Sequence, residues 1–401
     1  MKKIKYLPVC FIMVFMFFSC TKKEKSFQDI VNDQLEFASA QYLKLFDKTK
    51  DSLTLPRTTD KNGNLIMAPS DWWTSGFIPG TFWYLYENSM DTTFRSAAQN
   101  YTRRVEKEQY NTGTHDLGFM LFCSFGNGYR LTADTSYKRI MITGARSLCT
   151  RFRPPVGCIQ SWGSGNGWQC PVIIDNMMNL EFLLWATKAT GDSSYYKIAV
   201  THADTTIRNH FRSDYSSYHV VDYDTITGKV LARQTHQGAA DESAWSRGQA
   251  WALYGYTMMY RETKIPKYLD MAVNIADFIL EHPNLPSDKI PYWDFNAPAI
   301  PNEPRDASAA AIICSALIDL SQFVDVQQSE NYLKVARQQI TTLSSPLYCA
   351  EPGGNGGFIL KHSVGSKPAN SEIDVPLTYA DYYYVESLMK MKELLSRNTK
   401  N

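Results

Sequence analysis

Residues 183–199 read Leu-Leu-Trp-Ala-Thr-Lys-Ala-Thr-Gly-Asp-Ser-Ser-Tyr-Tyr-Lys-Ile-Ala, and this stretch decides the fold. An apolar segment ends in a short polar turn, aromatic residues follow, and an amphipathic segment that contains alanine begins. The same order recurs at four other places in the 401-residue chain, so the sequence predicts a repeated helical hairpin. The turns of the other copies are residues 86–91, 131–134, 261–263 and 324–325.

The recurring hairpins predict an all-α chain. The first helix of a pair is apolar nearly all round, as at 307–313, and should lie inside, whereas the second has a charged face and should lie outside. Short turns alternate with long connections rich in Gly, Pro and Trp, which places the long loops on one face. Pairing of the first helix with the last closes the predicted (α/α)6 barrel, a toroid of six hairpins; residues 219–224 also begin a candidate β-hairpin. The predicted helices are 27–48, 75–88, 92–110, 115–131, 135–152, 172–190, 193–211, 243–262, 266–281, 306–324, 330–343 and 374–396.

The first twenty residues predict an export signal. Lysines precede an apolar run, residues 7–18, which ends at Ser19-Cys20 and a polar stretch. The run is too short to span a bilayer, which needs about 20 apolar residues, and it is typical of a secretory signal. Because a cysteine after a small residue resembles the lipobox of bacterial lipoproteins, we expect residues 1–20 to be a lipoprotein signal ending at a lipidated Cys20. Residues 21–401 would then form a single catalytic domain anchored in the periplasm. The alternative is ordinary cleavage that leaves Cys20 as an odd thiol.

Composition excludes several classes of protein. With 44% hydrophobic and 20% charged residues the chain is neither disordered nor collagen-like. A net charge of +1 offers no basic surplus for nucleic acid. There is no Cys-x-x-Cys or His-x-x-x-His spacing, so we expect no metal site and no cofactor. Cys158 and Cys170 flank a loop rich in Gly and Trp, and the sequence leaves open whether they form a disulfide.

Unusual polar residues gather where long loops meet the predicted inner helices. The helix N-termini at that end favour an anion. His115 and Asp116 begin one helix, and Asp175 is expected about one turn inside another that starts at Pro171. A carboxyl among aliphatic residues should have a raised pKa, as a general acid requires. The alternatives are helix stabilisation by Asp116 and a buried structural role for Asp175.

A single arginine lies between tryptophans in Trp245-Ser-Arg-Gly-Gln-Ala-Trp251. Aromatic faces with the guanidinium of Arg247 suit a sugar ring that carries a carboxylate. The alternative is a helix whose tryptophans belong to the core. His219 and Gln237 lie in the loop before this helix, where a lone histidine is more often a surface residue than a functional one.

Five segments, in this order, resemble the unsaturated glucuronyl hydrolases of glycoside hydrolase family 88. The resemblance spans about residues 70–390. It implies an enzyme that removes a 4,5-unsaturated uronic acid from the non-reducing end of lyase-generated oligosaccharides. Such enzymes hydrate the C4=C5 double bond and do not attack the anomeric carbon. The segments are Trp-Thr-Ser-Gly-Phe at 73–77, His-Asp-Leu-Gly-Phe at 115–119, Asp-Asn-Met-Met-Asn at 175–179, residues 245–251, and Ala-Asp-Tyr-Tyr-Tyr at 380–384.

The resemblance also implies roles for individual residues. The position matched by Asp175 protonates C4 and helps deliver water to C5, after which the hemiketal opens and expels the next sugar. The position matched by Asp116 binds sugar hydroxyls and supports the catalytic carboxyl. The positions implied to line the substrate are Trp73, Phe77, His115, Trp162, His219, Gln237, Arg247 and Trp251.

Residues 363–367, Ser-Val-Gly-Ser-Lys, resemble a sulfate-binding segment of family members that act on sulfated glycosaminoglycans. Ser363, Ser366 and Lys367 are the candidate ligands, because hydroxyls and an ammonium can hold sulfate. The lysine comes one residue early, and the alternative is a polar surface turn.

The expected substrates are therefore unsaturated glycosaminoglycan disaccharides of the chondroitin, hyaluronan or heparin type. We expect a monomer or weak homo-oligomer that meets the membrane only through its lipid anchor and does not bind nucleic acid. Two alternatives stay open: an unsaturated rhamnogalacturonyl hydrolase acting on pectin fragments, and a helical glycan-binding lipoprotein without catalytic activity.

Overall fold

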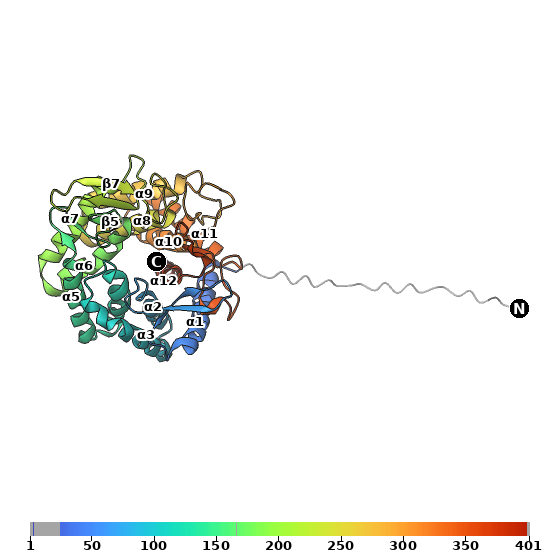
Figure 1. Ribbon diagram of the computed structural model, residues 1–401. Coiled ribbons are helices and arrows are strands. Elements are labelled where there is room, and N and C mark those ends of the chain that lie inside the picture. The colour runs from blue at the N-terminus through green and yellow to red at the C-terminus, as the bar shows by residue number, and fades with distance from the viewer. Residues whose placement is uncertain (1–2, 4–24, 166, 399–401) are drawn as a thin grey trace.

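Two concentric rings of helices make up the protein, as Figure 1 shows for the computed structural model, which describes residues 3, 25–165 and 167–398. Neighbouring inner helices pack side by side around the whole ring, which confirms the predicted (α/α)6 barrel. The inner ring contains α2 (Phe77–Ser89), α4 (Asn127–Thr132), α6 (Leu180–Thr190), α8 (Ser246–Thr263), α10 (Ala307–Leu320) and α12 (Thr378–Asn398). The outer ring contains α1 (Phe27–Thr49), α3 (Thr92–Val105), α5 (Thr135–Cys149), α7 (Ser193–His210), α9 (Pro266–Glu281) and α11 (Val326–Leu343).

The recurring turns explain where the outer helices begin. Four of these turns end in an aspartate whose side chain accepts a hydrogen bond from a backbone N–H of the next helix. This is the usual N-cap interaction, which satisfies a donor that the first helical turn leaves free. The capping residues are Asp91, Asp134, Asp192 and Asp325.

Inner and outer helices differ in burial as the sequence predicted. Every residue of α10 is buried, because this helix is covered on all sides. The first helix, α1, packs against the last, α12, and this confirms the predicted closure of the ring.

Two inner helices begin with irregular turns. A π-helix, η2 (Gly118–Gly126), precedes α4, and a 3₁₀-helix, η3 (Ile174–Asn179), precedes α6. The prediction that a helix starts at Pro171 was wrong. Pro171 begins strand β5 (Pro171–Ile173), which pairs with β6 (Val220–Tyr223). Asp175 therefore lies in the first turn of η3, directly after the strand. Two further 3₁₀ turns are η1 (Glu106–Tyr110) and η4 (Asn355–Gly357).

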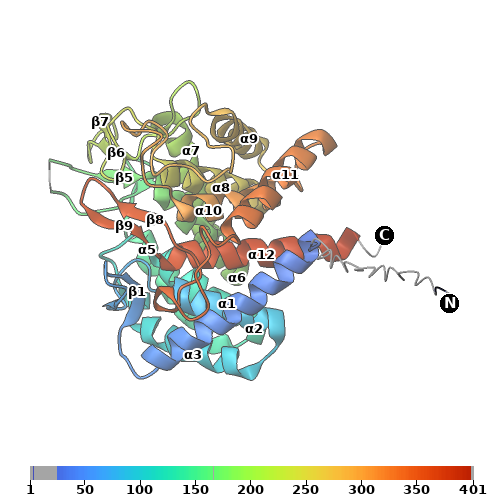
Figure 2. The same ribbon diagram turned by 90° about the vertical axis from the view of Figure 1, so that its right-hand side faces the viewer.

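The strands lie together at one end of the barrel, whereas α1 begins and α12 ends at the other (Figure 2). All pairs are antiparallel. The hairpin predicted near residue 220 is confirmed, and β5 extends it to three strands. The other strands were not predicted. They are β1 (Leu55–Thr59) with β2 (Leu65–Ala68), β3 (Phe152–Arg153) with β4 (Cys158–Ile159), β6 (Val220–Tyr223) with β7 (Val230–Gln234), and β8 (Ser363–Ser366) with β9 (Ser371–Val375).

Several expectations concern the chain ends and cysteines. Cys20 and most of the expected signal lie outside the described residues. Within the described ranges, no helix is both long enough and apolar enough to cross a bilayer. Cys158 and Cys170 are buried free thiols in a small apolar cluster beside β5 and β6, so no disulfide links them in this structure.

Candidate active site

Two carboxyl groups lie at the strand-bearing end of the barrel, each just before or within the irregular start of an inner helix. Asp116 precedes the π-helix η2, and Asp175 is in the 3₁₀-helix η3. The charge of Asp116 raises the pKa of Asp175, which means that the two groups are close enough to interact. π-helical turns are frequent at functional sites. The structure thus brings the two predicted acids to one place.

Burial dominates the electrostatics of Asp175. Removal from water raises the pKa of its carboxyl to about 7, while the nearby charge of Arg247 opposes that rise. Its Oδ2 atom has no hydrogen-bond partner within the protein, although the indole N–H of Trp251 is near enough to lower the pKa. A carboxyl with a pKa of about 7 keeps its proton on a substantial fraction of molecules at neutral pH and can act as a general acid.

His219 faces Asp175 with a defined tautomer. Its Nδ1 atom accepts hydrogen bonds from the backbone N–H groups of His236 at 3.0 Å and Gln237 at 3.1 Å. Because Nδ1 is an acceptor and burial lowers the pKa of the ring far below its usual value, the ring is neutral and carries its proton on Nε2. The His219 Nε2 atom lies 3.7 Å from Asp175 Oδ2. His219 is therefore a donor directed at the acid.

His115 has the opposite tautomer. Its Nδ1 lies 2.8 Å from the carbonyl oxygen of Ser161, which can only accept, so Nδ1 carries the proton. Burial and the charge of Arg151 lower the pKa of this ring to about 3, and the ring is neutral. Its Nε2 atom then carries a lone pair, lies 3.2 Å from Asp116 Oδ1 and has no hydrogen-bond partner in the protein. The ring therefore leaves an acceptor available in the site.

Asp116 is a buried carboxyl beside His115. Burial raises the pKa of its carboxyl to about 7, against the opposing effects of Thr114, Arg151 and Asn179. Oδ2 accepts from the Thr114 hydroxyl at 3.2 Å. No backbone N–H of η2 is among the donors to the carboxyl, and Asn179 Oδ1 caps that helix instead, accepting from Gly118 N at 2.8 Å. The structure therefore does not support the alternative that Asp116 serves as a helix cap.

Ser161 and Asn179 tie the two acid-bearing segments together. The Ser161 hydroxyl accepts from the backbone N–H of Ile173 at 3.0 Å, two residues before Asp175, while its carbonyl holds His115. Gly118 contacts Asn179 so closely that a Cβ there would lie 2.6 Å from Asn179 Oδ1. Glycine at position 118 is thus required for the close approach of η2 to η3.

Arg247 is bound to the β8 strand and not left free in the pocket. Its guanidinium donates to the carbonyls of Val364 and Gly365 and lies 3.3 Å from Asp306 Oδ2. Only Nε lacks a partner, and the side chain is buried. Gln237 donates to the same Gly365 carbonyl at 3.0 Å. Arg247 therefore supplies positive charge to the site while it holds β8 in place.

Aromatic residues form two walls. Trp162 stacks on Trp168 with ring centres 5.3 Å apart, and His236 packs edge-on against Trp162 at 5.1 Å. The second wall comes from other segments of the chain, where Trp73 packs against Tyr379 with ring centres 4.9 Å apart. The implied role of Phe77 needs correction, because this ring has no exposed surface and lies 5.9 Å behind Trp73. Phe77 supports the wall without forming it.

The residues predicted to bind sulfate are only partly free. The Lys367 ammonium pairs with Glu303 and lies 5.1 Å above the Trp293 ring. Ser363 and Ser366 are on β8, and their hydroxyls are buried without partners in the protein. A sulfate would therefore compete with a carboxylate for Lys367.

Buried polar atoms without partners gather around Asp175. Burial of a polar group without a hydrogen bond is costly, and such groups usually await a partner. These atoms indicate a polar ligand. Among the described residues, no group of three or more His, Cys, Asp and Glu side chains could hold a metal ion. The atoms include Asp175 Oδ2, His219 Nε2, His115 Nε2, Trp251 Nε1 and Asn176 Oδ1.

Comparison with known proteins decides the family. Residues 46–394 match the sequence profile of Glycosyl Hydrolase Family 88. The chain belongs to this family. The predicted membership is thereby confirmed, and with it the assignment of the protein as a glycoside hydrolase.

Relatives within the family have related names. The unsaturated glucuronyl hydrolase of Formosa agariphila is 43% identical over 98% of this chain and 100% of its own length. An unsaturated chondroitin disaccharide hydrolase of Streptococcus pneumoniae is 31% identical over 86% of this chain and 87% of its own. A solved unsaturated glucuronyl hydrolase described as specific for heparin superposes with a TM-score of 0.89 at 50% identity, covering 92% of this chain and 98% of that one.

Some residues of this family 88 site were not predicted. Trp168 forms half of one wall, and its indole N–H donates to Gln234 at 2.7 Å. Its place in the Gly- and Trp-rich loop was the available signal. Tyr379 lies one residue before a recognised motif and contacts both Trp73 and Arg247. Ser161 holds His115 through its backbone carbonyl, for which the local sequence carries no signal.

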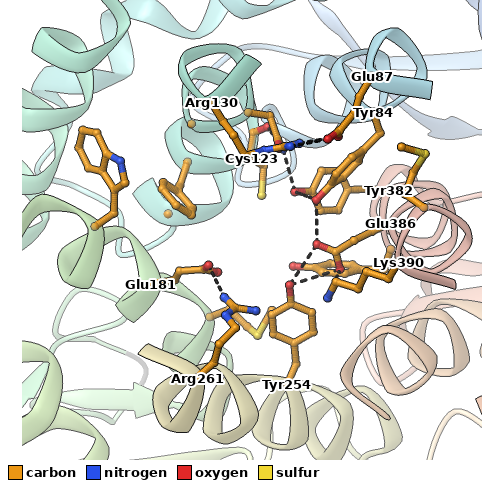
Figure 3. A pocket seen from close by; sticks show the side chains of 18 of the residues that line it. Tyr84, Glu87, Cys123, Arg130, Glu181, Tyr254, Arg261, Tyr382, Glu386 and Lys390 are labelled. Atoms are coloured by element: carbon orange, nitrogen blue, oxygen red, sulfur yellow. Dashed lines mark hydrogen bonds and ion pairs between the residues drawn. The ribbon is translucent and has the colours of Figure 1, made fainter. Parts of the chain in front are cut away.

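A cavity of about 870 Å³, called here the second cavity because neither Asp116 nor Asp175 lines it, lies among the inner helices (Figure 3). It is lined mainly by the C-terminal halves of the inner helices, with Gly118 and Phe119 nearest the acids. Its charged groups are paired: Arg130 binds Glu87 through two hydrogen bonds of 2.6 Å, and Arg261 binds Glu181. A polar network of this kind holds the inner helices together and leaves the two aspartates as the chemical centre.

Proposed function

We infer that the protein removes the 4,5-unsaturated glucuronic acid from the non-reducing end of lyase-generated glycosaminoglycan oligosaccharides, by hydration of the C4=C5 double bond. Family membership and the names of the relatives support this function. The observation that carries it is a buried carboxyl, Asp175, with a pKa near 7 and a histidine donor directed at it. A site that only binds sugar has no need for such a proton.

The chemistry follows from the proton on Asp175. Transfer of that proton to C4 breaks the double bond and leaves positive charge at C5, which the ring oxygen stabilises. Water then adds to C5 and returns a proton to the Asp175 carboxylate. The resulting hemiketal opens, and the next sugar leaves from C1. His219 N–H stabilises the carboxylate between the two proton transfers.

The identity of the substrate rests on the relatives and on the walls of the site. The 50%-identical solved neighbour is described as specific for heparin, while the chondroitin hydrolase named above is 31% identical. Heparin-derived unsaturated disaccharides are therefore the first substrates to test. Trp162 and Trp168 on one side and Trp73 on the other offer ring faces to the two sugars.

One assay tests the function. The conjugated enoate of the substrate absorbs ultraviolet light, and hydration removes that absorbance. Lyase digests of heparin, chondroitin, hyaluronan and rhamnogalacturonan are mixed separately with the protein. We expect loss of absorbance with at least one glycosaminoglycan digest. Loss with the pectin-derived digest alone would make the protein a rhamnogalacturonyl hydrolase, and no loss with any digest would leave only glycan binding.

Anchorage is part of the proposal and rests on the sequence of residues 1–26. In this view Cys20 carries lipid and holds the enzyme at the periplasmic side of a membrane, as a monomer or a weak homo-oligomer. Growth with an alkyne-labelled fatty acid should label the wild-type protein and not the Cys20→Ala variant. Equal labelling of both, or of neither, would contradict the anchor.

A further inference from the structure

Arg151 is a buried arginine outside the set of residues assigned to the site. It lies two residues after the end of α5, and its buried guanidinium spans three backbone carbonyls of two loops. Nε donates to Gln160 O at 2.8 Å, Nη1 to Thr112 O at 2.8 Å and Nη2 to Ser161 O at 3.0 Å. A planar guanidinium with several fixed donors suits such a fork, whereas lysine has a single point charge.

One of these carbonyls is shared with a residue of the site. Ser161 O accepts from Arg151 Nη2 and also from His115 Nδ1 at 2.8 Å. The orientation of this carbonyl therefore decides which ring nitrogen of His115 carries the proton. The other nitrogen is left as a lone pair 3.2 Å from Asp116 Oδ1.

We propose that Arg151 is a positioning residue of the hydrolase: by holding the Ser161 carbonyl it keeps His115 in the Nδ1–H tautomer, so that Nε2 is presented to the site as an acceptor. Nε2 is buried and has no hydrogen-bond partner in the protein, so it is available to a hydroxyl of the substrate. If the carbonyl turned away, His115 could carry its proton on Nε2 and would then present a donor in place of the acceptor.

Several charged groups act on His115 and on the two acids. Arg151 lowers the pKa of both His115 and Asp116 through its charge, and Asp116 raises that of Asp175, which also interacts with Arg247 and His219. Arg151 thus has two effects, a charge and a fork of donors. Arg151→Lys keeps the charge and loses the fork, whereas Arg151→Met loses both.

The tautomer can be measured without substrate, so this inference rests on the proposed function only for its catalytic consequence. Long-range ¹H–¹⁵N spectra of protein labelled at its seven histidines distinguish the two tautomers, and the His115 signals are those absent from the His115→Asn spectrum. We expect the Nδ1–H form in the wild type and its loss in both Arg151 variants. Arg153→Met is the matched control, because Arg153 binds the Gln160 side chain and does not contact Ser161 O. It should leave the His115 signals unchanged.

Kinetics separate positioning from simple support of the fold. In variants that melt cooperatively, both Arg151 substitutions should lower kcat at least tenfold with little change in KM. The inference is overturned if wild-type His115 carries its proton on Nε2, or if Arg151→Met keeps the Nδ1–H tautomer. A wild-type enzyme without activity would instead contradict the proposed function.

Discussion

His219 Nε2 lies 3.7 Å from Asp175 Oδ2, and the other nitrogen of this ring accepts two backbone N–H groups. His115 presents the opposite tautomer to Asp116. One histidine therefore presents a donor to its carboxyl and the other presents an acceptor, and neither of these ring nitrogens has a hydrogen-bond partner in the protein. Different surroundings of this kind separate the roles of two neighbouring acids.

The pH dependence of catalysis follows from Asp175. Its carboxyl must be protonated to act as the acid, and burial places its pKa at about 7. We expect kcat/KM to fall as the pH rises through about 7, while His115, with a pKa of about 3, stays neutral throughout. Since the charge of Asp116 raises the pKa of Asp175, the variant Asp116→Asn should move the alkaline limb to lower pH. Constant kcat/KM up to pH 9 would exclude Asp175 as the acid.

Sulfate preference depends on Glu303. Burial raises the pKa of this carboxyl, but Lys367, Trp293 and the Ala299 N–H lower it more, so Glu303 is ionised and neutralises Lys367. The variant Glu303→Gln keeps the shape and frees the ammonium. It should increase kcat/KM for sulfated relative to unsulfated disaccharides by roughly tenfold, the size of one charge-assisted hydrogen bond.

Lys367→Met is the matched control for that experiment. It should abolish any gain when combined with Glu303→Gln, because the ammonium is the group that would bind sulfate. An equal ratio of the two substrates in wild type and Glu303→Gln would show that residues 363–367 do not meet the sulfate group.

The stacked tryptophans should contribute to binding more than to chemistry. Trp162 and Trp168 are both partly exposed and stack on each other. Trp162→Ala should raise KM roughly tenfold, about 1.4 kcal/mol, with kcat nearly unchanged. Trp168→Ala should also raise KM, because it removes the other ring of the stack. A large fall in kcat with constant KM in Trp162→Ala would assign this ring a different role.

Glu386 should stabilise the fold without taking part in catalysis. It is buried in the second cavity, where it accepts from Tyr84 at 2.8 Å, Tyr254 at 3.1 Å and Ser315, and lies 3.4 Å from Lys390 (Figure 3). Removal of one partner from a buried ion pair costs about 3–5 kcal/mol. Glu386→Ala should therefore lower the free energy of unfolding in urea by about 3 kcal/mol.

The exposed pair of Glu393 with Arg397 on the same helix provides the control. Such surface pairs contribute about 0–1 kcal/mol, so Glu393→Ala should change the free energy of unfolding little. Activity of folded Glu386→Ala should match the wild type. Lost activity in that variant at a temperature where it stays folded would connect the second cavity to the reaction.

The sequence predicted the barrel well because its signals are local. Four of the five turns carry a capping aspartate and a nearby aromatic residue, as at Asp192 and Tyr196, and these signals repeat. The start of the sixth predicted helix was wrong because pairing of Val172 with Val221, a residue distant in sequence, turns that segment into a strand. Local pattern cannot reveal a partner of that kind.

The residues of the site also differ in how strongly the local sequence signals them. Asp116, Asp175 and His115 stand out in the sequence because they are titratable residues at the loop ends, whereas the role of His219 was implied only by the family resemblance. Arg151 was not predicted, since an arginine that binds carbonyls of another loop has no distinctive neighbours in the sequence. The burial of Phe77 behind Trp73 was likewise not predictable, because two adjacent aromatic positions in a motif do not show which ring faces the pocket.

The central claim is that Asp175 delivers a proton to C4 of the substrate. The most direct test is hydrolysis of the best disaccharide in D₂O, followed by early-time NMR of the released uronic acid. For the wild type we expect one deuteron at C4, added to a single face, at the same rate as the absorbance is lost. Asp175→Asn should be folded and release no sugar. Turnover by this variant at the wild-type rate, or product that forms without deuterium at C4, would contradict the account.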